Sequence, residues 1–375
     1  MNVRVSLNIF FESRYDSQVF FGNRRLTVFR DRLRSRIELQ DRYFECMDFS
    51  KLTHLVSGHV EARIVQASVE LGLFDCLAER PLSSGEIASK LGINAVATEL
   101  LLNALVALTL LEKDGDSHAL STVARTHLIR GTPQSLCGMI RFEASLWNDW
   151  ARLADAVRSG EPVRAPDMYQ ATSEETSRFI GAMDSLVKAR GDAEVLAKVL
   201  DWQGITEMLD VGSGPATYPI YLCKQWPMLR VTVFDLPGTL AVTRRYVQES
   251  GLEERFTLLA GDYRADEIPG RYQAIFLSNI IHGEGSEENA KLMAKLAATL
   301  EPGGRVIIKD HILAEDRANP PVGAIFSLLM LLTTKSGRCY SFDEVAGWLK
   351  AAGLQHVKQI DLPEPLTSSL VVAEN

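Results

Sequence analysis

Short apolar runs alternate with amphipathic stretches in the second half of the chain, from about residue 205 onward. The runs predict strands at 207–211, 230–236, 256–261, 272–279 and 304–313, and the stretches predict helices near 218–226, 239–250, 286–300 and 342–352. This alternation is typical of a mostly parallel sheet covered by helices on both faces. Two final runs, 356–362 and 369–373, predict an antiparallel hairpin at the end of the sheet. Ligands of such sheets bind at the carboxyl ends of the strands.

The first half has a different pattern, of helices with a small β-wing. An amphipathic helix is expected over 52–77, and Ser83 with Glu86 offers a helix start. A second helix over 94–111 and a hairpin turn at 112–116 complete a winged helix-turn-helix. Residues 95–106 contain no Lys or Arg, although phosphate contacts dominate nucleic-acid affinity, so DNA binding is disfavoured. The apolar surplus of this helix favours a subunit interface instead.

These patterns divide the chain into four segments. They are an atypical N-terminal extension (1–46), a winged-helix domain (47–135), a helical linker that contributes to a pocket (136–200) and the α/β domain (201–375). The extension holds nine arginines and no lysine, without clear periodicity. We therefore expect the native chain to begin at Met47, the alternative being an arm that packs on a partner subunit.

Composition narrows the functional classes. The formal net charge of −8 gives no support for binding nucleic acid or an anionic membrane surface. The five cysteines are scattered and form no Cys-x-x-Cys pair, which indicates a cytoplasmic protein without a disulfide framework, and no metal site is expected. The longest apolar stretch, 324–332, is shorter than the roughly 20 residues that span a bilayer.

Polar residues stand where the predicted strands end. Asp210, Gly212 and Gly214 follow the first strand, and Asp235 ends the second, an arrangement that suits a bound nucleoside. A dinucleotide fingerprint would need glycine where Thr217 stands, which disfavours a nicotinamide enzyme. The later ends carry these residues: Gly261, Asp262, Tyr263, Ser278, Asn279, His282 and Asp310.

Six segments, in this order and spacing, resemble the S-adenosylmethionine (SAM)-dependent small-molecule O-methyltransferases, which include plant caffeate, flavonoid and acetylserotonin methyltransferases. They are Leu209–Gly214, Phe234–Pro237, Gly261–Asp262, Leu277–His282, Glu301–Val306 and Gly337–Ser341. The resemblance covers about residues 50–375. It implies a Rossmann-like class I methyltransferase domain, an N-terminal winged-helix dimerisation domain, a homodimer and a small-molecule acceptor.

The resemblance also implies residue roles. Gly212 and Gly214 would face the methionine portion of SAM, Asp235 the ribose, and Asp262 with Tyr263 the adenine. The full expected cofactor set is Asp210, Gly212, Gly214, Asp235, Leu236, Gly261, Asp262, Tyr263 and Ser278. His282 would be the general base, oriented by Asp310. A phenol has a pKa of about 10 and needs a base at neutral pH, a task for which histidine is suited.

Some positions depart from the family pattern. Ala216 replaces the third glycine, Ser278 stands where plant members carry lysine, and Cys339 stands where they carry a second acid. The last departure leaves open an N- or C-methyltransferase, or an enzyme that uses SAM without transferring methyl; a winged-helix ligand-responsive regulator is a further alternative. An apolar acceptor pocket suited to an aromatic or polyketide-like molecule is expected from Trp147, Phe179, Met183, Met330 and Cys339.

Overall fold

The computed structural model describes residues 47–375, so the expectations for residues 1–46 lie outside the described part of the chain. The chain divides into two units, residues up to His59 and residues from Val60 to Asn375. Helix α2 (Phe49–Leu71) begins in the first unit and ends in the second. The expected helix over 52–77 is interrupted at Gly72, which takes a left-handed conformation (φ 75°) between α2 and α3 (Leu73–Cys76).

The winged-helix region packs a three-stranded antiparallel sheet, in the order β1-β3-β2, against helices. Its elements are β1 (Leu82–Ser83), α4 (Ser84–Leu91), α5 (Ala95–Ala107), β2 (Leu111–Asp114), β3 (Ser117–Leu120) and α6 (Thr122–His127). Ser83 caps α4 in a capping box with Glu86, as the sequence predicts. The expected five-residue turn at 112–116 is wrong, because 111–114 pair as a strand and the turn contains only Gly115 and Asp116.

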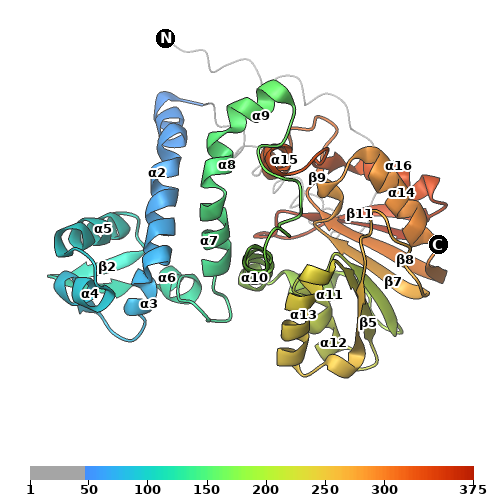
Figure 1. The fold of residues 1–375 in the computed structure, drawn as a ribbon, viewed down its shortest axis with the longest axis horizontal. Helices are drawn as coiled ribbons and strands as arrows, with labels where there is room; N and C mark the ends of the chain where they lie inside the picture. The colour runs from blue at the N-terminus through green and yellow to red at the C-terminus, as the bar shows by residue number, and fades with distance from the viewer. Residues whose placement is uncertain (1–46) are drawn as a thin grey trace, which may run out of the picture. The chain divides into compact units, whose positions relative to one another are not determined.

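Helices connect this region to the α/β domain (Figure 1). They are α7 (Cys137–Ser145), α8 (Trp147–Ala151), α9 (Leu153–Ser159), α10 (Ser173–Arg190) and α11 (Asp192–Val199). Helices α7 and α10 pack together: a Cβ on Gly138 would lie 3.0 Å from the Gly181 carbonyl oxygen. Among the described helices, no single one is both long and apolar enough to cross a membrane; the bent pair α4 and α5 meets that test only when the two are taken together.

The α/β domain holds a seven-stranded sheet in the order β11-β12-β8-β7-β4-β5-β6. The strands are β4 (Glu207–Val211), β5 (Arg230–Asp235), β6 (Phe256–Ala260), β7 (Tyr272–Ser278), β8 (Leu300–Asp310), β11 (Gln355–Asp361) and β12 (Ser369–Glu374). Strands β4 to β8 are parallel, whereas β12 runs antiparallel to both β8 and β11. The predicted mostly parallel sheet with a terminal antiparallel hairpin is therefore confirmed.

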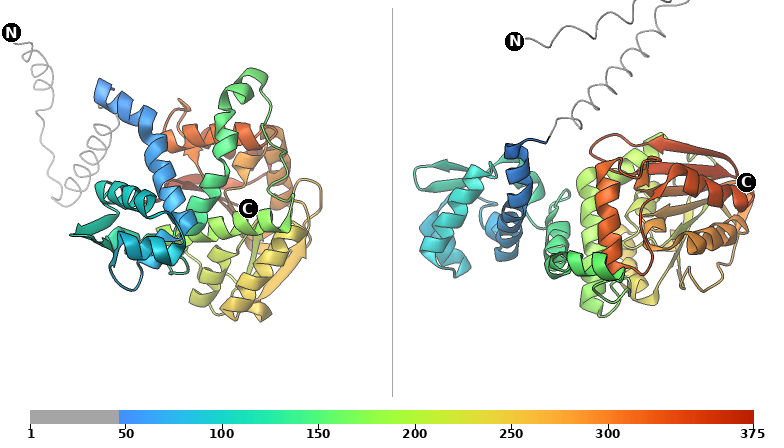
Figure 2. Two further views of the ribbon diagram at one scale, coloured as in Figure 1. Left: turned by 60° about the vertical axis from the view of Figure 1, so that its left-hand side comes forward. Right: turned by 90° about the horizontal axis from the view of Figure 1, so that it is seen from above.

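Helices cover both faces of this sheet (Figures 1 and 2). They are α12 (Thr217–Gln225), α13 (Pro237–Ser250), α14 (Ser286–Ala297) and α16 (Phe342–Ala351). Helix α15 (Pro321–Thr333) packs against α8 and α9 instead. Neighbouring strand residues enter different cores: Leu209 packs with Met293 and Leu349 of α14 and α16, and Met208 packs with the α11 and α12 side. This alternation places neighbouring side chains in the two helix layers on opposite faces of the sheet.

The expected strand over 304–313 is shifted in the structure. Strand β8 begins at Leu300, which pairs with Tyr272 before a register shift, and it ends at Asp310. After His311 the chain forms a separate short strand, β9 (Ile312–Leu313), which pairs with β10 (Tyr340–Ser341). Asp310 is therefore the last residue of β8, at the carboxyl end of the strand, where its side chain can serve a site.

Candidate active site

The loop between β4 and α12 brings the backbone close to its neighbours. Gly212 (φ 65°) and Gly214 (φ 60°) are both in the left-handed region that favours glycine. A Cβ on Gly212 would lie 2.3 Å from Cδ1 of Ile280, so the position also needs glycine for space. Ala216 keeps the left-handed conformation (φ 58°) without being a glycine, and its side chain is fully buried in the core.

A cavity opens at the carboxyl ends of β4, β5, β6 and β7. The structure brings eight of the nine predicted cofactor residues into its lining: Asp210, Gly212, Gly214, Asp235, Leu236, Asp262, Tyr263 and Ser278. The ninth, Gly261, is not among the lining residues. A Cβ there would lie 2.3 Å from the ring of Phe234, so core packing accounts for that glycine.

Two buried carboxyl groups line this cavity. Asp235 accepts hydrogen bonds from the backbone N–H groups of Gly214 (2.9 Å) and Leu236 (2.7 Å), yet burial raises its pKa to about 6. Each carboxylate oxygen can accept a second bond, which leaves room for ligand hydroxyl groups. Burial raises the pKa of Asp210 to about 8, although the Ser213 hydroxyl donates to it at 2.6 Å. Asp210 is therefore mostly protonated at neutral pH.

The end of β6 carries the residues expected to face a nucleobase. Arg264 binds the Asp262 carboxylate with two groups, Nε at 2.9 Å and Nη2 at 2.8 Å, and this pairing lowers the pKa of Asp262. The Tyr263 hydroxyl donates to Oε1 of Glu284 at 3.0 Å. The ring of Tyr263 also reaches the glycine loop, 4.0 Å from where a Cβ on Gly212 would lie. The Tyr263 ring and the Asp262 carboxylate, which Arg264 holds in place, thus lie together in the cavity at the end of β6.

The segment before α10 also contributes to the cavity; it lies within the linker (136–200) from which a pocket contribution was expected, although the sequence singled out neither of its cavity residues. Met168 and Gln170 line it, and the Gln170 amide donates to Oγ1 of Thr239 at 3.2 Å. Met168 (φ 55°) and Tyr169 (φ 61°) are both left-handed, a conformation that no sequence signal announces in such residues. Tyr169 stacks on Phe179 with ring centroids 4.5 Å apart. This segment therefore connects the cavity to an aromatic cluster.

His282 and Asp310 form a buried pair. The Nδ1 atom of His282 donates to Oδ1 of Asp310 at 2.7 Å, with His282 9% and Asp310 1% exposed. Burial by itself raises the pKa of Asp310, but the neighbouring His282 and His311 outweigh it and leave the pKa below its ordinary value. The backbone N–H of His311 donates to the same oxygen at 2.7 Å. Asp310 is thus ionised and holds the histidine with its Nε2 atom directed away from the pair.

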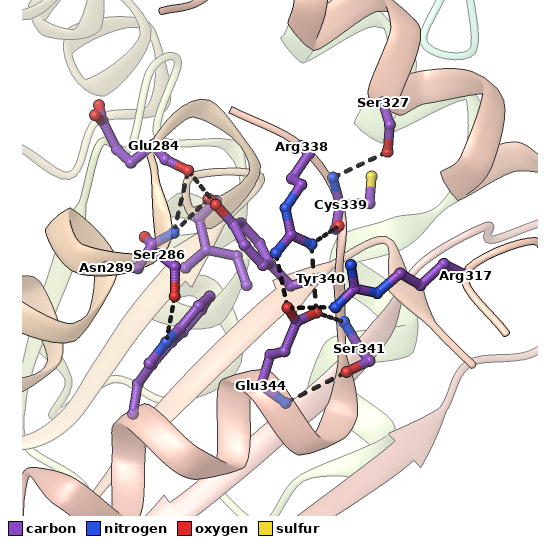
Figure 3. Close-up of polar contacts among 12 residues, drawn as sticks. Glu284, Ser286, Asn289, Arg317, Ser327, Arg338, Cys339, Tyr340, Ser341 and Glu344 are labelled. Atoms are coloured by element: carbon purple, nitrogen blue, oxygen red, sulfur yellow. Dashed lines mark hydrogen bonds and ion pairs between the residues drawn. The ribbon is translucent and has the colours of Figure 1, made fainter. Parts of the chain in front are cut away.

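The turn that carries His282 (Ile281–Gly283) is fixed from two sides. Asn289 donates to the Ile281 carbonyl oxygen at 2.8 Å, and the Tyr340 hydroxyl donates to the Glu284 carbonyl oxygen at 2.6 Å. Figure 3 shows Tyr340 beside Arg338, whose guanidinium carbon lies 4.2 Å from the centroid of the Tyr340 ring.

The same segment makes two further contacts. Arg338 Nη2 donates to Oε1 of Glu344 at 2.7 Å, and Glu344 forms a capping box with Ser341 at the start of α16 (Figure 3). A Cβ on Gly337 would lie 2.3 Å from the His282 carbonyl oxygen, so only glycine lets this segment approach the turn so closely.

Cys339 stands where the resemblance would place a second acid beside the histidine. Its thiol is buried, and burial together with the nearby Asp310 raises its pKa to about 12, so it stays protonated. Within the described chain, the one carboxylate that pairs with His282 is that of Asp310.

An apolar cluster adjoins the His282 ring. Three of the five predicted pocket residues, Phe179, Met183 and Met330, pack there together with Phe326 and Trp150. The Phe326 ring meets the His282 ring edge-on, with centroids 4.8 Å apart. The other two predicted pocket residues lie outside this cluster: Trp147 is 39% exposed, and Cys339 is buried beside Asp310. Phe179 and Met183 also line the cofactor cavity, so cavity and cluster are contiguous.

Comparison with known proteins identifies the family. A model of the O-methyltransferase domain matches residues 150–355, and a model of the O-methyltransferase dimerisation domain matches residues 53–130. The chain belongs to the O-methyltransferase family. It is a SAM-dependent methyltransferase, as the sequence predicts.

Relatives of this O-methyltransferase extend over most of its length. It is 32% identical to 3-hydroxy-5-methyl-1-naphthoate 3-O-methyltransferase of Streptomyces sahachiroi, over 85% of this chain and 93% of the relative. It is 30% identical to the N,N-dimethyltransferase OxyT of Streptomyces rimosus, over 69% of this chain and 77% of that relative. Human N-acetylserotonin methyltransferase in complex with SAM superimposes with a TM-score of 0.79 at 25% identity, over 88% of this chain and 99% of that one.

Proposed function

We propose that this methyltransferase transfers the methyl group of SAM to a hydroxyl group of a small aromatic or polyketide-like acceptor, with His282 as the general base and Asp310 as the residue that orients it. The buried hydrogen bond between the two side chains, at 2.7 Å, is the observation that carries the proposal. The relative from Streptomyces sahachiroi, whose name describes 3-O-methylation of a hydroxynaphthoate, supports the acceptor class.

In this proposal His282 removes the proton of the acceptor hydroxyl, and Asp310 orients His282. The Asp310 carboxylate accepts the Nδ1 hydrogen, which leaves the lone pair on Nε2 to take the proton of the acceptor hydroxyl. The same carboxylate stabilises the imidazolium ion that then forms. SAM supplies, when bound, a methyl group on a positively charged sulfur, which is already a good electrophile. The remaining task of the chain is to align the acceptor oxygen with that methyl group and to exclude water.

The cavity fits SAM by its own chemistry. Asp235 retains acceptor capacity for ribose hydroxyls, and the glycines of the loop let the protein backbone approach a bound ligand closely. The buried Ser278 hydroxyl lines the cavity, with the Tyr218 hydroxyl as its neighbour, so it lies where a bound ligand could contact it. The apolar cluster around Phe179 and Phe326 offers an acceptor flat surfaces close to His282.

We also propose a homodimer and a cytoplasmic location. The match to the dimerisation domain supports the first, together with Val96 and Leu100 of α5, which are 70% and 68% exposed. The four cysteines of the described chain are all buried and unpaired, which supports the second.

The test is a methyl-transfer assay with labelled SAM and a panel of hydroxynaphthoates and hydroxylated polycyclic acceptors, followed by mass spectrometry of the products. The proposal predicts oxygen-linked methyl groups and a large loss of turnover in His282→Ala with cofactor binding intact. Transfer to oxygen with unimpaired turnover in that variant would remove His282 from its role.

N-methylation is a second candidate, because one relative is named as an N,N-dimethyltransferase. An amino group on an aromatic ring is unprotonated at neutral pH and can attack the methyl group without first losing a proton, so His282→Ala would then lose far less activity. Offering matched acceptors that carry a hydroxyl or an amino group at the same ring position separates the two candidates. C-methylation, or use of SAM without methyl transfer, would appear in the same product analysis.

A further inference from the structure

A network of buried charges lies at one end of the cofactor cavity. Asp192, the first residue of α11, is fully buried. Its carboxylate accepts two bonds from Arg190, Nε to Oδ1 at 3.0 Å and Nη2 to Oδ2 at 2.8 Å. Nζ of Lys309 lies 3.0 Å from Oδ2, and the Tyr218 hydroxyl donates to the same oxygen at 3.2 Å. Gly191 (φ 70°) makes the turn that lets Arg190 face Asp192.

The network reaches the cavity through Arg190 and Tyr218, which both line it. Lys309 lies on β8 and pairs in register with Ser278 of β7. Because the strand order is β8-β7-β4-β5-β6, this end lies on the far side of β4 from Asp262, which follows β6. Asp235, the residue suited to the ribose, is the last residue of β5 and stands on the Asp262 side of β4. With the ribose at Asp235, as the proposed function has it, the amino-acid portion of SAM would extend toward the network.

Charge distinguishes the two ends of the cavity. Arg190 and Arg264 are the two cationic residues of its lining within the described chain. Arg264 is paired with Asp262 alone, so that pair is neutral. Arg190 and Lys309 share one carboxylate, so their trio with Asp192 has a formal charge of +1 when Lys309 is protonated and is neutral when it is not; burial lowers the pKa of Lys309. In either state the Arg190 guanidinium keeps its positive charge. Asp210 does not compensate this charge at neutral pH, because burial keeps it mostly protonated.

Arg190 is also held in a defined orientation. Its Nε and Nη2 atoms bind Asp192, and Nη1 lies 3.4 Å from Oγ1 of Thr367 as a weak donor. A guanidinium has five N–H donors, so its outer edge retains capacity for a second anion. Lys309 and Asp310 are neighbours on β8 and face opposite sides, so Asp310 reaches His282 whereas Lys309 reaches Asp192.

We propose that Arg190 binds the carboxylate of the methionine portion of SAM, and that Asp192 and Lys309 position Arg190 for this contact. Arg190 would bind a carboxylate at one end of the cavity, whereas Arg264 at the other end is already neutralised by Asp262. This difference would also determine which way round SAM binds. The proposal rests on SAM binding and is independent of the acceptor and of the role of His282.

The experiment compares two ligands by calorimetry: S-adenosylhomocysteine and its decarboxylated analogue S-adenosyl-3-thiopropylamine, which keeps the nucleoside, the thioether and the amine. In Arg190→Gln we expect the affinity for S-adenosylhomocysteine to fall roughly 10- to 100-fold, the range for a charged hydrogen bond. The affinity for the decarboxylated analogue should stay within about twofold of the wild type. Arg190→Lys keeps the charge without the planar donor edge and should show a smaller, equally selective loss.

Arg264→Gln is the matched control, because it removes an arginine from the opposite end of the same cavity. It should change the affinity for both ligands by the same factor. If Arg190→Gln lowers the affinity for both ligands by the same factor, or changes neither affinity, the carboxylate contact is refuted. If Arg190→Gln does not fold, Arg190→Lys decides the question: a loss confined to the carboxylate-bearing ligand supports the contact, and equal affinities or equal losses overturn it.

Discussion

Replacing Gly337 by alanine should displace the turn that carries His282 (Ile281–Gly283) without changing either member of the proposed catalytic pair. The new Cβ would lie 2.3 Å from the His282 carbonyl oxygen and 2.9 Å from the Gly283 carbonyl carbon. Ordinary contacts begin near 3.4 Å, so the turn or the segment before Tyr340 must move by about 1 Å. A displacement of that size can cost about 100-fold in rate when it misplaces a catalytic group. Overpacking should also destabilise the fold by about 1–3 kcal/mol.

The assay measures kcat for methyl transfer at saturating SAM and acceptor, normalised to the folded fraction, with S-adenosylhomocysteine affinity measured by calorimetry. Gly283→Ala is the control: it lies next to His282, yet a Cβ there meets nothing within 4 Å. We expect Gly337→Ala to lose about 10- to 100-fold in kcat with little change in cofactor affinity, and Gly283→Ala to stay near the wild type. Equal turnover in the two variants would show that the close approach does not position His282.

Three further changes test other parts of the site. Asp235→Asn should lower the affinity for S-adenosylhomocysteine roughly 10- to 100-fold, as measured by calorimetry. The affinity of the wild type should fall below about pH 6, as Asp235 is protonated, and an affinity that does not change with pH would refute this. Because folding raises the pKa of Asp210 to about 8, the stability gained from its protonated form is full below about pH 4 and lost as pH rises toward 8. Asp210→Asn should flatten that decline in urea unfolding, and an unchanged pH slope would contradict the assignment. Tyr340→Phe removes the bond to the Glu284 carbonyl and should lower kcat several-fold more than cofactor affinity; an equal loss in both would indicate general destabilisation.

The sequence predicted most of the α/β domain, because burial on both faces of a parallel sheet leaves uninterrupted apolar runs. The residues after those runs meet at one edge of the sheet by topology alone, which is why Asp210, Asp235 and Ser278 were found together in one cavity. The pairing of His282 with Asp310 follows from the same rule, since β7 and β8 are adjacent and parallel.

Other features depend on contacts that no local pattern reveals. Gly261 is a glycine because of the Phe234 ring, not because of the cavity. The start of β8 at Leu300 is set by pairing with Tyr272, whereas residues 302–304 suggest a turn. The sequence does contain one signal of the buried charge network. Lys309 interrupts an apolar strand, and a buried charge requires a partner, which the structure shows to be Asp192.

The central claim, that His282 acts as the base for methylation of a hydroxyl group, is tested most directly by His282→Ala. The measurement is turnover with a hydroxynaphthoate acceptor that the wild type methylates, beside S-adenosylhomocysteine affinity in the same preparation. We expect a loss of at least about 100-fold in kcat, the lower range for general-base catalysis, with cofactor affinity within about twofold of the wild type. Near-normal turnover in a variant that still binds the cofactor would contradict it.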